Sequence, residues 1–164
     1  MKYILSALGL KILTFGIIII LLVGGAFVAV MEFHNYVENK RIEEANQRFI
    51  TAVDIAYNEQ KDLDVGGLTP FDTLYRYTEL LQINADKLAS TYFTKQTRVA
   101  ELHRMDGVSY QKRWDFIWLL KADQDILKSQ KTLGSMANIS KPLPLVMKKT
   151  QSGIWQIESI NYSF

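Results

Sequence analysis

The sequence predicts an α+β protein in which one N-terminal transmembrane helix and a helical stalk precede helices packed on an antiparallel sheet. Three observations lead to this prediction: a charge-free apolar run near the N-terminus, a helical spacing of apolar residues after it, and a two-residue period in the C-terminal half. We expect four parts: a cytoplasmic tail over 1–11, a transmembrane helix over 12–31, a stalk and linker over 32–67, and a small α+β domain over 68–164.

The predicted anchor, residues 12–31, has no charged side chain. A helix of this length spans about 30 Å, the thickness of a bilayer's hydrocarbon core. Lys2 and Lys11 precede the run and Glu32 and Glu38 follow it, so the positive-inside rule places the N-terminus in the cytoplasm. We therefore expect the inner (cytoplasmic) membrane as the location, with the C-terminal domain periplasmic or extracellular. The residues taken to represent the anchor are Ile12, Phe15, Ile20, Gly25 and Ala29.

Two alternatives concern this anchor. A cleaved signal peptide would have an apolar region of about 7–15 residues. Here the run is longer, and the one tolerable cleavage site, Gly24-Gly25-Ala26, lies inside it, which favours an uncleaved signal-anchor. The pair Gly25 and Ala29 would let two anchors approach closely, although glycine is common in membrane helices and no dimer role is the favoured interpretation.

Composition excludes several classes of function. The chain has no cysteine, which removes disulfides, thiolate nucleophiles and cysteine zinc sites. Residues 32–164 carry 17 basic and 17 acidic side chains, so this part is neutral and has no general attraction for nucleic acid. The charge is uneven, with a net −5 over 32–93 and +5 over 94–164. Either the two halves face each other, or a basic sheet surface meets an acidic partner or lipid headgroups.

The predicted stalk, from Asn35 to about Gln60, has apolar residues at three- and four-residue steps. No proline or glycine separates it from the anchor, so one continuous helix can run through both. Its apolar stripe covers either its own domain, the favoured interpretation, or a partner helix. The residues expected to contact a partner are Ile42, Phe49 and Val53.

Turn and capping residues divide the domain. Residues 62–67 predict a turn, and Thr69 then predicts a helix N-cap, with Pro70 in the first helical position and Asp72 three residues after the cap. Asn84 predicts the cap of the next helix. Residues 94–103 fit either a short helix or the start of the sheet.

The C-terminal half predicts strands. Alternation after Gly107 indicates a long half-buried strand over 108–120, and 126–133 fits a second strand or a helix. Residues 143–149 and 154–163 flank a four-residue hairpin turn. The alternation changes parity within the last strand, which predicts a β-bulge near Glu158–Ser159.

The chain also resembles a known superfamily. The runs 74–81, 84–89, 92–94 and 152–160 are similar to the opening helices and last strand of nuclear-transport-factor-2-like domains, over roughly residues 68–164. The resemblance implies a curved antiparallel sheet wrapped around helices to form a conical cavity. The anchored layout resembles inner-membrane scaffold subunits of type IV secretion and conjugation machines, although this domain is shorter and lacks their Asn-Pro-x-Gly turn.

The candidate site residues follow from these elements. Trp114, Phe116 and Trp118 would share one strand face, as core or cavity lining, with a hydrophobic ligand as the minority interpretation. His103, near Arg104 and Asp106, is more simply a surface histidine than a proton shuttle. No catalytic, cofactor-binding or metal-ligating residue is predicted, and no cofactor. The full set expected to line a cavity is Tyr75, Trp114, Phe116, Trp118 and Trp155.

The function expected from the sequence is a non-enzymatic single-pass subunit or scaffold of a bacterial cell-envelope complex. Its expected partners are the lipid bilayer and other membrane or envelope proteins, a second copy of this chain among them, and not nucleic acid. The alternative is a membrane-tethered ligand-binding or enzymatic domain of the cone fold, which requires a deep pocket with convergent polar groups.

Overall fold

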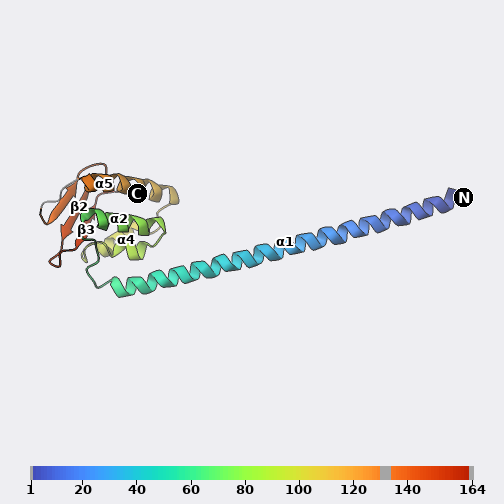
Figure 1. The fold of residues 1–164 in the computed structure, drawn as a ribbon, viewed down its shortest axis with the longest axis horizontal. Coiled ribbons are helices and arrows are strands. Elements are labelled where there is room, and N and C mark those ends of the chain that lie inside the picture. The colour runs from blue at the N-terminus through green and yellow to red at the C-terminus, as the bar shows by residue number, and fades with distance from the viewer. Residues whose placement is uncertain (1, 130–133, 163–164) are drawn as a thin grey trace. The chain divides into compact units, whose positions relative to one another are not determined.

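The computed structural model of the protein describes residues 2–129 and 134–162, with the backbone alone over 2–22. The chain divides into two compact units, Met1–Phe49 and Ile50–Phe164. Helix α1, Lys2–Gln60, runs through the first unit and ends in the second (Figure 1). The prediction of one continuous helix through anchor and stalk is confirmed, since prolines occur only later in the chain.

Wherever the structure describes side chains, no helix is long and apolar enough to cross a membrane. Residues 12–22 of the predicted anchor lie outside that part of the chain.

Helix α2, Pro70–Gln82, begins as its sequence predicts. Thr69 is the N-cap, and its hydroxyl oxygen accepts a hydrogen bond of 3.0 Å from the backbone N–H of Asp72. Pro70 occupies the first turn, where its missing N–H costs no helical hydrogen bond. Residues 61–69 connect α1 to α2, so the predicted break after Gln60 is also confirmed.

The next three helices are α3, Asp86–Ser90, α4, Arg98–Met105, and α5, Tyr110–Ser129. Residues 94–103, for which the sequence allowed either a short helix or the start of the sheet, therefore form a loop followed by the first part of helix α4. Asn84 is not a helix cap: it adopts φ +59°, directly after α2, and Ala85 is the residue that precedes α3. Asparagine tolerates this left-handed conformation better than most residues. Asparagine is also common at helix N-caps, which is why the sequence predicted a cap at this position.

The strand predicted over 108–120 is wrong, because residues 110–120 belong to α5 and no strand is assigned at 108–109. The residues that α5 buries follow a helical spacing, and among them only Phe116 belongs to the alternating aromatic set. Side chains two residues apart on a helix point about 200° apart, so Phe116 cannot share a face with Trp114 and Trp118. The second segment, 126–133, is helical as far as Ser129, and 130–133 lie outside the described residues. The residues that α5 buries are Phe116, Ile117, Leu120, Asp123, Gln124 and Leu127.

The sheet has three antiparallel strands in the order β1-β2-β3: Met136–Ile139, Leu145–Lys149 and Trp155–Ile160. The predicted hairpin between β2 and β3 is confirmed. Its turn is closed by a 2.7 Å hydrogen bond from the Thr150 N–H to the Ile154 carbonyl. Gly153 adopts φ +85°, a conformation that glycine allows without strain.

The predicted β-bulge is also confirmed. Met147 pairs with Ile157 and Val146 pairs with Ser159, so Glu158 is the extra residue in β3. The insertion brings Ile160 opposite Leu145, on the same face as Ile157. Both isoleucines thus contribute to one core although they stand an odd number of positions, three, apart.

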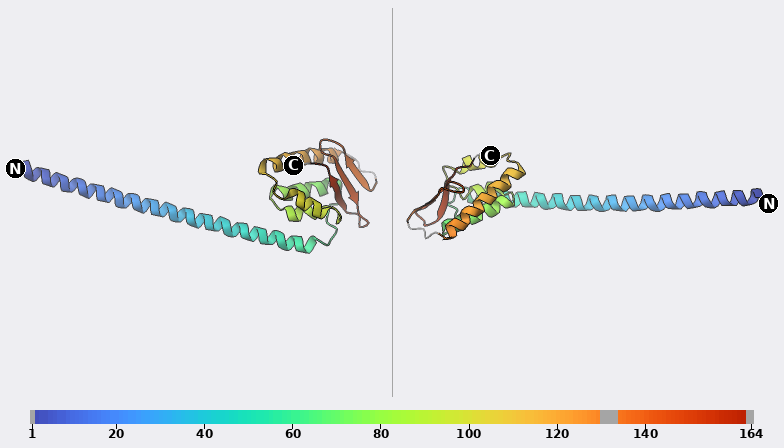
Figure 2. Two further views of the ribbon diagram at one scale, coloured as in Figure 1. Left: turned by 180° about the vertical axis from the view of Figure 1, so that it is seen from behind. Right: turned by 90° about the horizontal axis from the view of Figure 1, so that it is seen from above.

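One core joins the helices to the sheet. Helices α2 to α5 lie on one side of the three strands (Figure 2), and α2 contacts α5, α3 and β3. The coarse prediction of an α+β domain with helices on an antiparallel sheet is therefore confirmed. The largest fully buried side chains of the cluster include Tyr77, Phe116, Leu74, Leu81, Met105, Ile117, Leu120, Leu145, Met147 and Ile157.

Candidate partner-binding site

The predicted partner-contact residues on α1 lie in two environments. Ile42 and Phe49 are 55% and 40% exposed. Val53 is half-buried in the second unit, where the adjacent residue Asp54 forms an ion pair of 2.7 Å with the Lys87 ammonium. The apolar stripe is therefore partly covered near the end of α1 and exposed before it.

The predicted anchor residues are only partly described. The side chains of Ile12, Phe15 and Ile20 lie outside the described set, whereas Gly25 and Ala29 are exposed. Nothing lies within 4 Å of a Cβ placed on Gly25.

The residues expected to line a cavity do not come together. Phe116 and Trp155 are buried in the core, whereas Tyr75 on α2 is 44% exposed. Trp114 and Trp118 on α5 are 37% and 70% exposed. The expectation that Trp114, Phe116 and Trp118 share one face is wrong, since α5 turns Phe116 inward and Trp118 outward.

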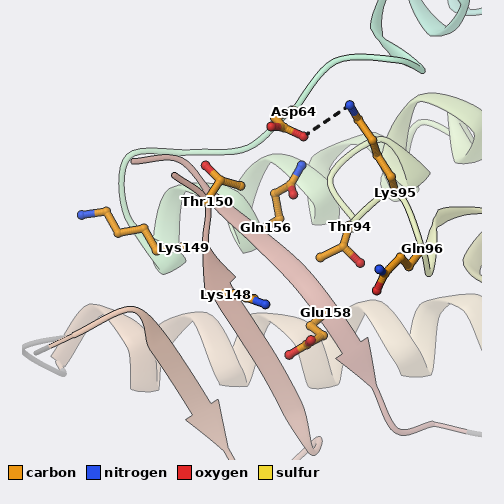
Figure 3. A pocket seen from close by; sticks show the side chains of 9 residues that line it. All are labelled: Asp64, Thr94, Lys95, Gln96, Lys148, Lys149, Thr150, Gln156 and Glu158. Carbon is orange, nitrogen blue, oxygen red and sulfur yellow. Dashed lines mark ion pairs between the residues drawn. The ribbon is translucent and has the colours of Figure 1, made fainter. Parts of the chain in front are cut away.

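A polar depression of about 250 Å³ lies where the β2–β3 hairpin meets the segment before α4 (Figure 3). We call it the basic depression, because three lysines are among its lining residues. Lys95 forms an ion pair of 3.8 Å with Asp64, which the linker before α2 contributes. The residues that line the basic depression are Asp64, Thr94, Lys95, Gln96, Lys148, Lys149, Thr150, Gln156 and Glu158.

The chemistry of the basic depression suits an acidic group. Ammonium, hydroxyl and carboxamide groups supply hydrogen-bond donors, and only two carboxylates, Asp64 and Glu158, oppose them. The bulge at Glu158 and the hairpin turn at Thr150 place their side chains along its rim (Figure 3). The positive net charge of residues 94–164 pointed to such a surface, but the particular residues follow only from the fold.

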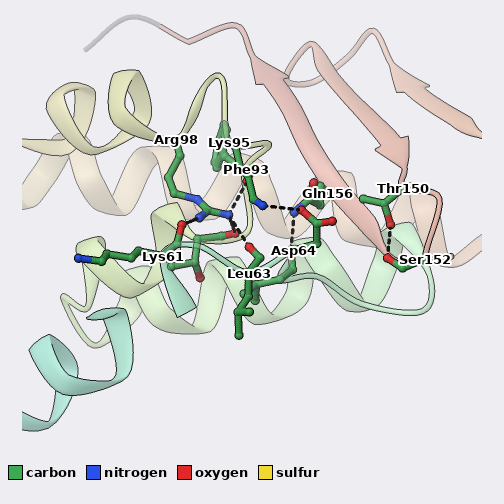
Figure 4. Close-up of polar contacts among 11 residues, drawn as sticks. Lys61, Leu63, Asp64, Phe93, Lys95, Arg98, Thr150, Ser152 and Gln156 are labelled. Carbon is green, nitrogen blue, oxygen red and sulfur yellow. Dashed lines mark hydrogen bonds and ion pairs between the residues drawn. The ribbon is translucent and has the colours of Figure 1, made fainter. Parts of the chain in front are cut away.

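One wall of the basic depression is held by Arg98, which is buried at the start of α4 (Figure 4). Its Nη2 donates to the Thr91 carbonyl at 2.8 Å and to the Leu63 and Phe93 carbonyls at 3.2 Å. Its Nη1 donates to the Lys61 carbonyl. Burial lowers the pKa of the Arg98 guanidinium, and the four carbonyl oxygens compensate for its lost hydration.

A second contact fixes the same linker. The Gln156 carboxamide, on β3, donates to the Val65 carbonyl at 3.2 Å. The segment 61–65 is thereby bound to α4 by Arg98 and to the sheet by Gln156 (Figure 4). Sequence reasoning missed Arg98, because a single arginine after a polar stretch resembles an ordinary solvated charge.

The most buried titratable cluster lies inside the domain. Tyr77 donates its hydroxyl proton to the Glu101 carboxylate, which also accepts from Arg104 at 2.7 Å (Nε to Oε2) and 2.8 Å (Nη2 to Oε1). Burial raises the pKa of Glu101, and burial together with the neighbouring carboxylate raises the pKa of Tyr77 well above its usual range. Both carboxylate oxygens are occupied, so this cluster is better suited to stabilising the core than to proton transfer.

His103 lies on a different surface. It is exposed and lines a depression of about 340 Å³ together with Asp86, Lys87, Leu102 and Asp106. Asp86 is already paired with Arg113, with 2.7 Å between Nη2 and Oδ2. Within residues 2–129 and 134–162, no group of three or more histidine or acidic side chains is placed to hold a metal ion.

Comparison with known proteins adds no relative: no family model, no curated protein and no solved structure matches this chain.

Proposed function

We propose that this chain is a single-pass membrane protein that serves as a non-enzymatic subunit or scaffold of a bacterial cell-envelope complex. The observation that carries the proposal is the charge-free run at 12–31, placed within a helix that continues to Gln60. Twenty-nine residues of α1 follow Met31, which at 1.5 Å per residue is about 43 Å. In this proposal the Ile50–Phe164 domain lies outside the cytoplasm, where it meets its partners.

The proposed mode of action is binding of an acidic segment of a partner protein at the basic depression. A carboxylate brought between Lys95 and Lys148 would gain charge-assisted hydrogen bonds from two exposed ammonium groups (Figure 3). The linker wall is already held by Arg98 and Gln156, so little ordering of the domain accompanies binding. Preorganisation of this kind supports a binding role.

The first experiment tests the anchor. Full-length protein is expressed in a bacterial host, and the membranes are washed at alkaline pH and then extracted with mild detergent. We expect the chain to remain in the pellet through the wash and to enter solution only with detergent. Recovery of the uncleaved chain in the aqueous fraction without detergent would overturn the anchored part of the proposal.

The second experiment tests the basic depression. Proteins cross-linked to the full chain in membranes are compared between wild type and the charge-reversal variant K148E/K149E. A matched control, K112E/K128E, makes the same change in net charge on exposed positions of α5. We expect the partner to be lost from K148E/K149E and kept by the control. Equal capture by all three proteins would contradict a role for the depression.

The alternative of an enzymatic or ligand-binding cone fold gains no support from the described domain. Its requirement is a deep pocket with convergent polar groups. The aromatic residues expected to line that pocket are divided between the core and the surface, and Phe116 and Leu120 have no exposed surface. No observation therefore favours this alternative.

A further inference from the structure

Helix α5 carries a row of exposed aromatic side chains on its solvent face. Tyr110 and Trp118 are 74% and 70% exposed, and Trp114 lies between them. The three follow at intervals of four residues, which places them along one stripe of a helix. The rings of Tyr110 and Trp114 contact each other edge-on, with centroids 5.9 Å apart. We call Tyr110, Trp114 and Trp118 the aromatic ladder.

The aromatic ladder needs an explanation because its residues have no part in the core. Indole and phenol rings in water are costly when they form a contiguous patch, and such patches commonly mark interaction sites. Tryptophan and tyrosine are also the residues that contribute most to binding energy when they enter a pocket on a partner. The spacing of four residues is that of a helix which inserts successive side chains into a groove.

A groove of matching chemistry exists on the same chain. It has a volume of about 440 Å³ and an apolar floor of Leu80, Ile83, Leu88 and Tyr92. Ile83 is 51% exposed, so the floor is open to an incoming side chain. We call this the α2–α3 groove. Its remaining lining residues are Gln60, Arg76 and Glu79.

Charge at the edges of the two surfaces is complementary. Arg76 and Glu79 border the α2–α3 groove with one charge of each sign. Beside the aromatic ladder, Asp115, Lys121 and Asp125 are exposed on α5 and again supply both signs. A register that pairs Arg76 with an aspartate and Glu79 with Lys121 adds specificity to the apolar contact.

Within one molecule the aromatic ladder cannot reach the α2–α3 groove. The Gln124 carboxamide of α5 donates to the Thr78 hydroxyl of α2 at 2.7 Å, which identifies the side of α2 that faces α5. Leu80 lies about 200° around the helix from Thr78, on the other side of α2. The two surfaces are therefore separated by α2 and can meet only between copies.

We propose that the aromatic ladder of one copy of this chain binds in the α2–α3 groove of a second copy. The proposal deepens the function proposed above, because it names one partner of the domain. The aromatic ladder and the α2–α3 groove are different surfaces, so successive copies can associate head to tail. Alternatively, two copies related by a two-fold axis can each place their ladder in the other's groove. Tethering in one membrane favours either arrangement by raising the local concentration.

The absence of cysteine from the sequence makes a direct test available. The single variants K121C, beside the aromatic ladder, and E79C, at the rim of the groove, are prepared in the full chain. They are purified in mild detergent, mixed, oxidised and separated without reductant. We expect a disulfide-linked pair in the mixture that exceeds what either variant forms alone. A matched control mixes E79C with K148C, which lies in the basic depression, and should give no such excess.

Substitutions within the aromatic ladder and the α2–α3 groove test whether these surfaces cause the cross-linking. We expect W118A added to K121C, or I83D added to E79C, to lower the cross-linking yield roughly tenfold, which corresponds to about 1.4 kcal/mol. W118F should keep most of the yield, because it retains an aromatic ring. Both altered side chains are more than half exposed, so the melting temperature of the domain should be unchanged. Unchanged yield with W118A, or equal yield with the K148C control, would overturn the proposal.

The two proposals fail in different ways. The chain can be found in the membrane and capture other proteins, yet give no excess disulfide cross-linking. That result contradicts only the proposed contact between the aromatic ladder and the α2–α3 groove. A chain recovered in the aqueous fraction contradicts the membrane role, whereas its cross-linking still reports on contact between domains.

Discussion

The carboxylate of Asp123 accepts a hydrogen bond from the backbone N–H of Leu143 at 3.4 Å, across the junction between α5 and the sheet. Its second oxygen, Oδ2, is buried and has no hydrogen-bond partner among the described residues. Asp123 has no exposed surface. Burial raises the pKa of this carboxyl group from 3.8 to about 6, because the charged form loses its hydration.

This pKa predicts a stability that falls as pH rises. The folded domain binds the Asp123 proton more tightly than the unfolded chain, so the contribution is complete below about pH 4 and is lost as pH passes 6. A shift of this size corresponds to about 3 kcal/mol. We expect the free energy of unfolding in urea to be lower at pH 8 than at pH 5. The raised pKa of Glu101 acts in the same direction.

The variant D123N separates Asp123 from the other groups. An amide has a similar shape and remains neutral, so D123N should be more stable than wild type at pH 8 and should lose most of the pH dependence. Denaturant unfolding of the full chain at both pH values measures this. If the free energy of unfolding of D123N changed with pH as much as that of wild type, another titratable group would be responsible for the pH dependence.

Arg98 provides a second prediction. R98Q removes the guanidinium from four backbone carbonyls, and we expect a loss of about 3 kcal/mol in the free energy of unfolding. Hydrogen exchange should also accelerate over 61–67 before the core exchanges. R98K keeps the charge but not the planar fork of donors, so it should rescue only part of the stability. Full rescue by R98K would contradict the role of the bonding geometry.

Tyr77 and Glu101 allow a smaller substitution. Y77F keeps the buried ring and removes one hydrogen-bond donor to the Glu101 carboxylate. We expect a cost of about 1–3 kcal/mol, because a buried acceptor loses a partner. The double variant Y77F/E101Q should lose less than the two single variants together. Strict additivity in chemical unfolding would indicate that the pair is not coupled.

The cap of α2 is the simplest prediction. T69A removes the oxygen that accepts from the Asp72 N–H, and it should destabilise the domain by about 1 kcal/mol. T69S retains that oxygen and is the matched control. Thermal unfolding should place T69S near wild type and T69A below it. Equal loss in both variants would assign the effect to the methyl group rather than to the cap.

Several features were predictable from short stretches of sequence. The N-cap at Thr69, the hairpin turn that includes Gly153 and the bulge at Glu158 each depend on a few neighbouring residues. The bulge is instructive, because the parity change between Ile157 and Ile160 signals it directly. Local backbone chemistry decides such features, so no distant contact is needed to infer them.

The error over 108–120 has a definite cause. Trp114 and Phe116 alternate with the polar residues Arg113 and Asp115, and a short alternation of this kind fits a strand as well as a helix with exposed rings. The choice depends on which residues are buried: Leu120 is buried, and Gln124 donates a hydrogen bond to Thr78 of α2. The aromatic ladder therefore does not follow from the sequence alone, although the sequence does predict that Trp114 and Trp118 share a face.

From the sequence alone follow the continuous helix to Gln60, the break after it, the capped start of α2 and the hairpin that ends the domain. Each depends on residue types within about one helical turn or one hairpin, where local sterics and hydrogen bonding dominate. Only the tertiary structure decided that α5 is a helix, that Arg98 binds carbonyls from two distant segments, and that Trp118 faces water. Burial depends on what the rest of the chain packs against each side chain, and a single segment does not contain that information.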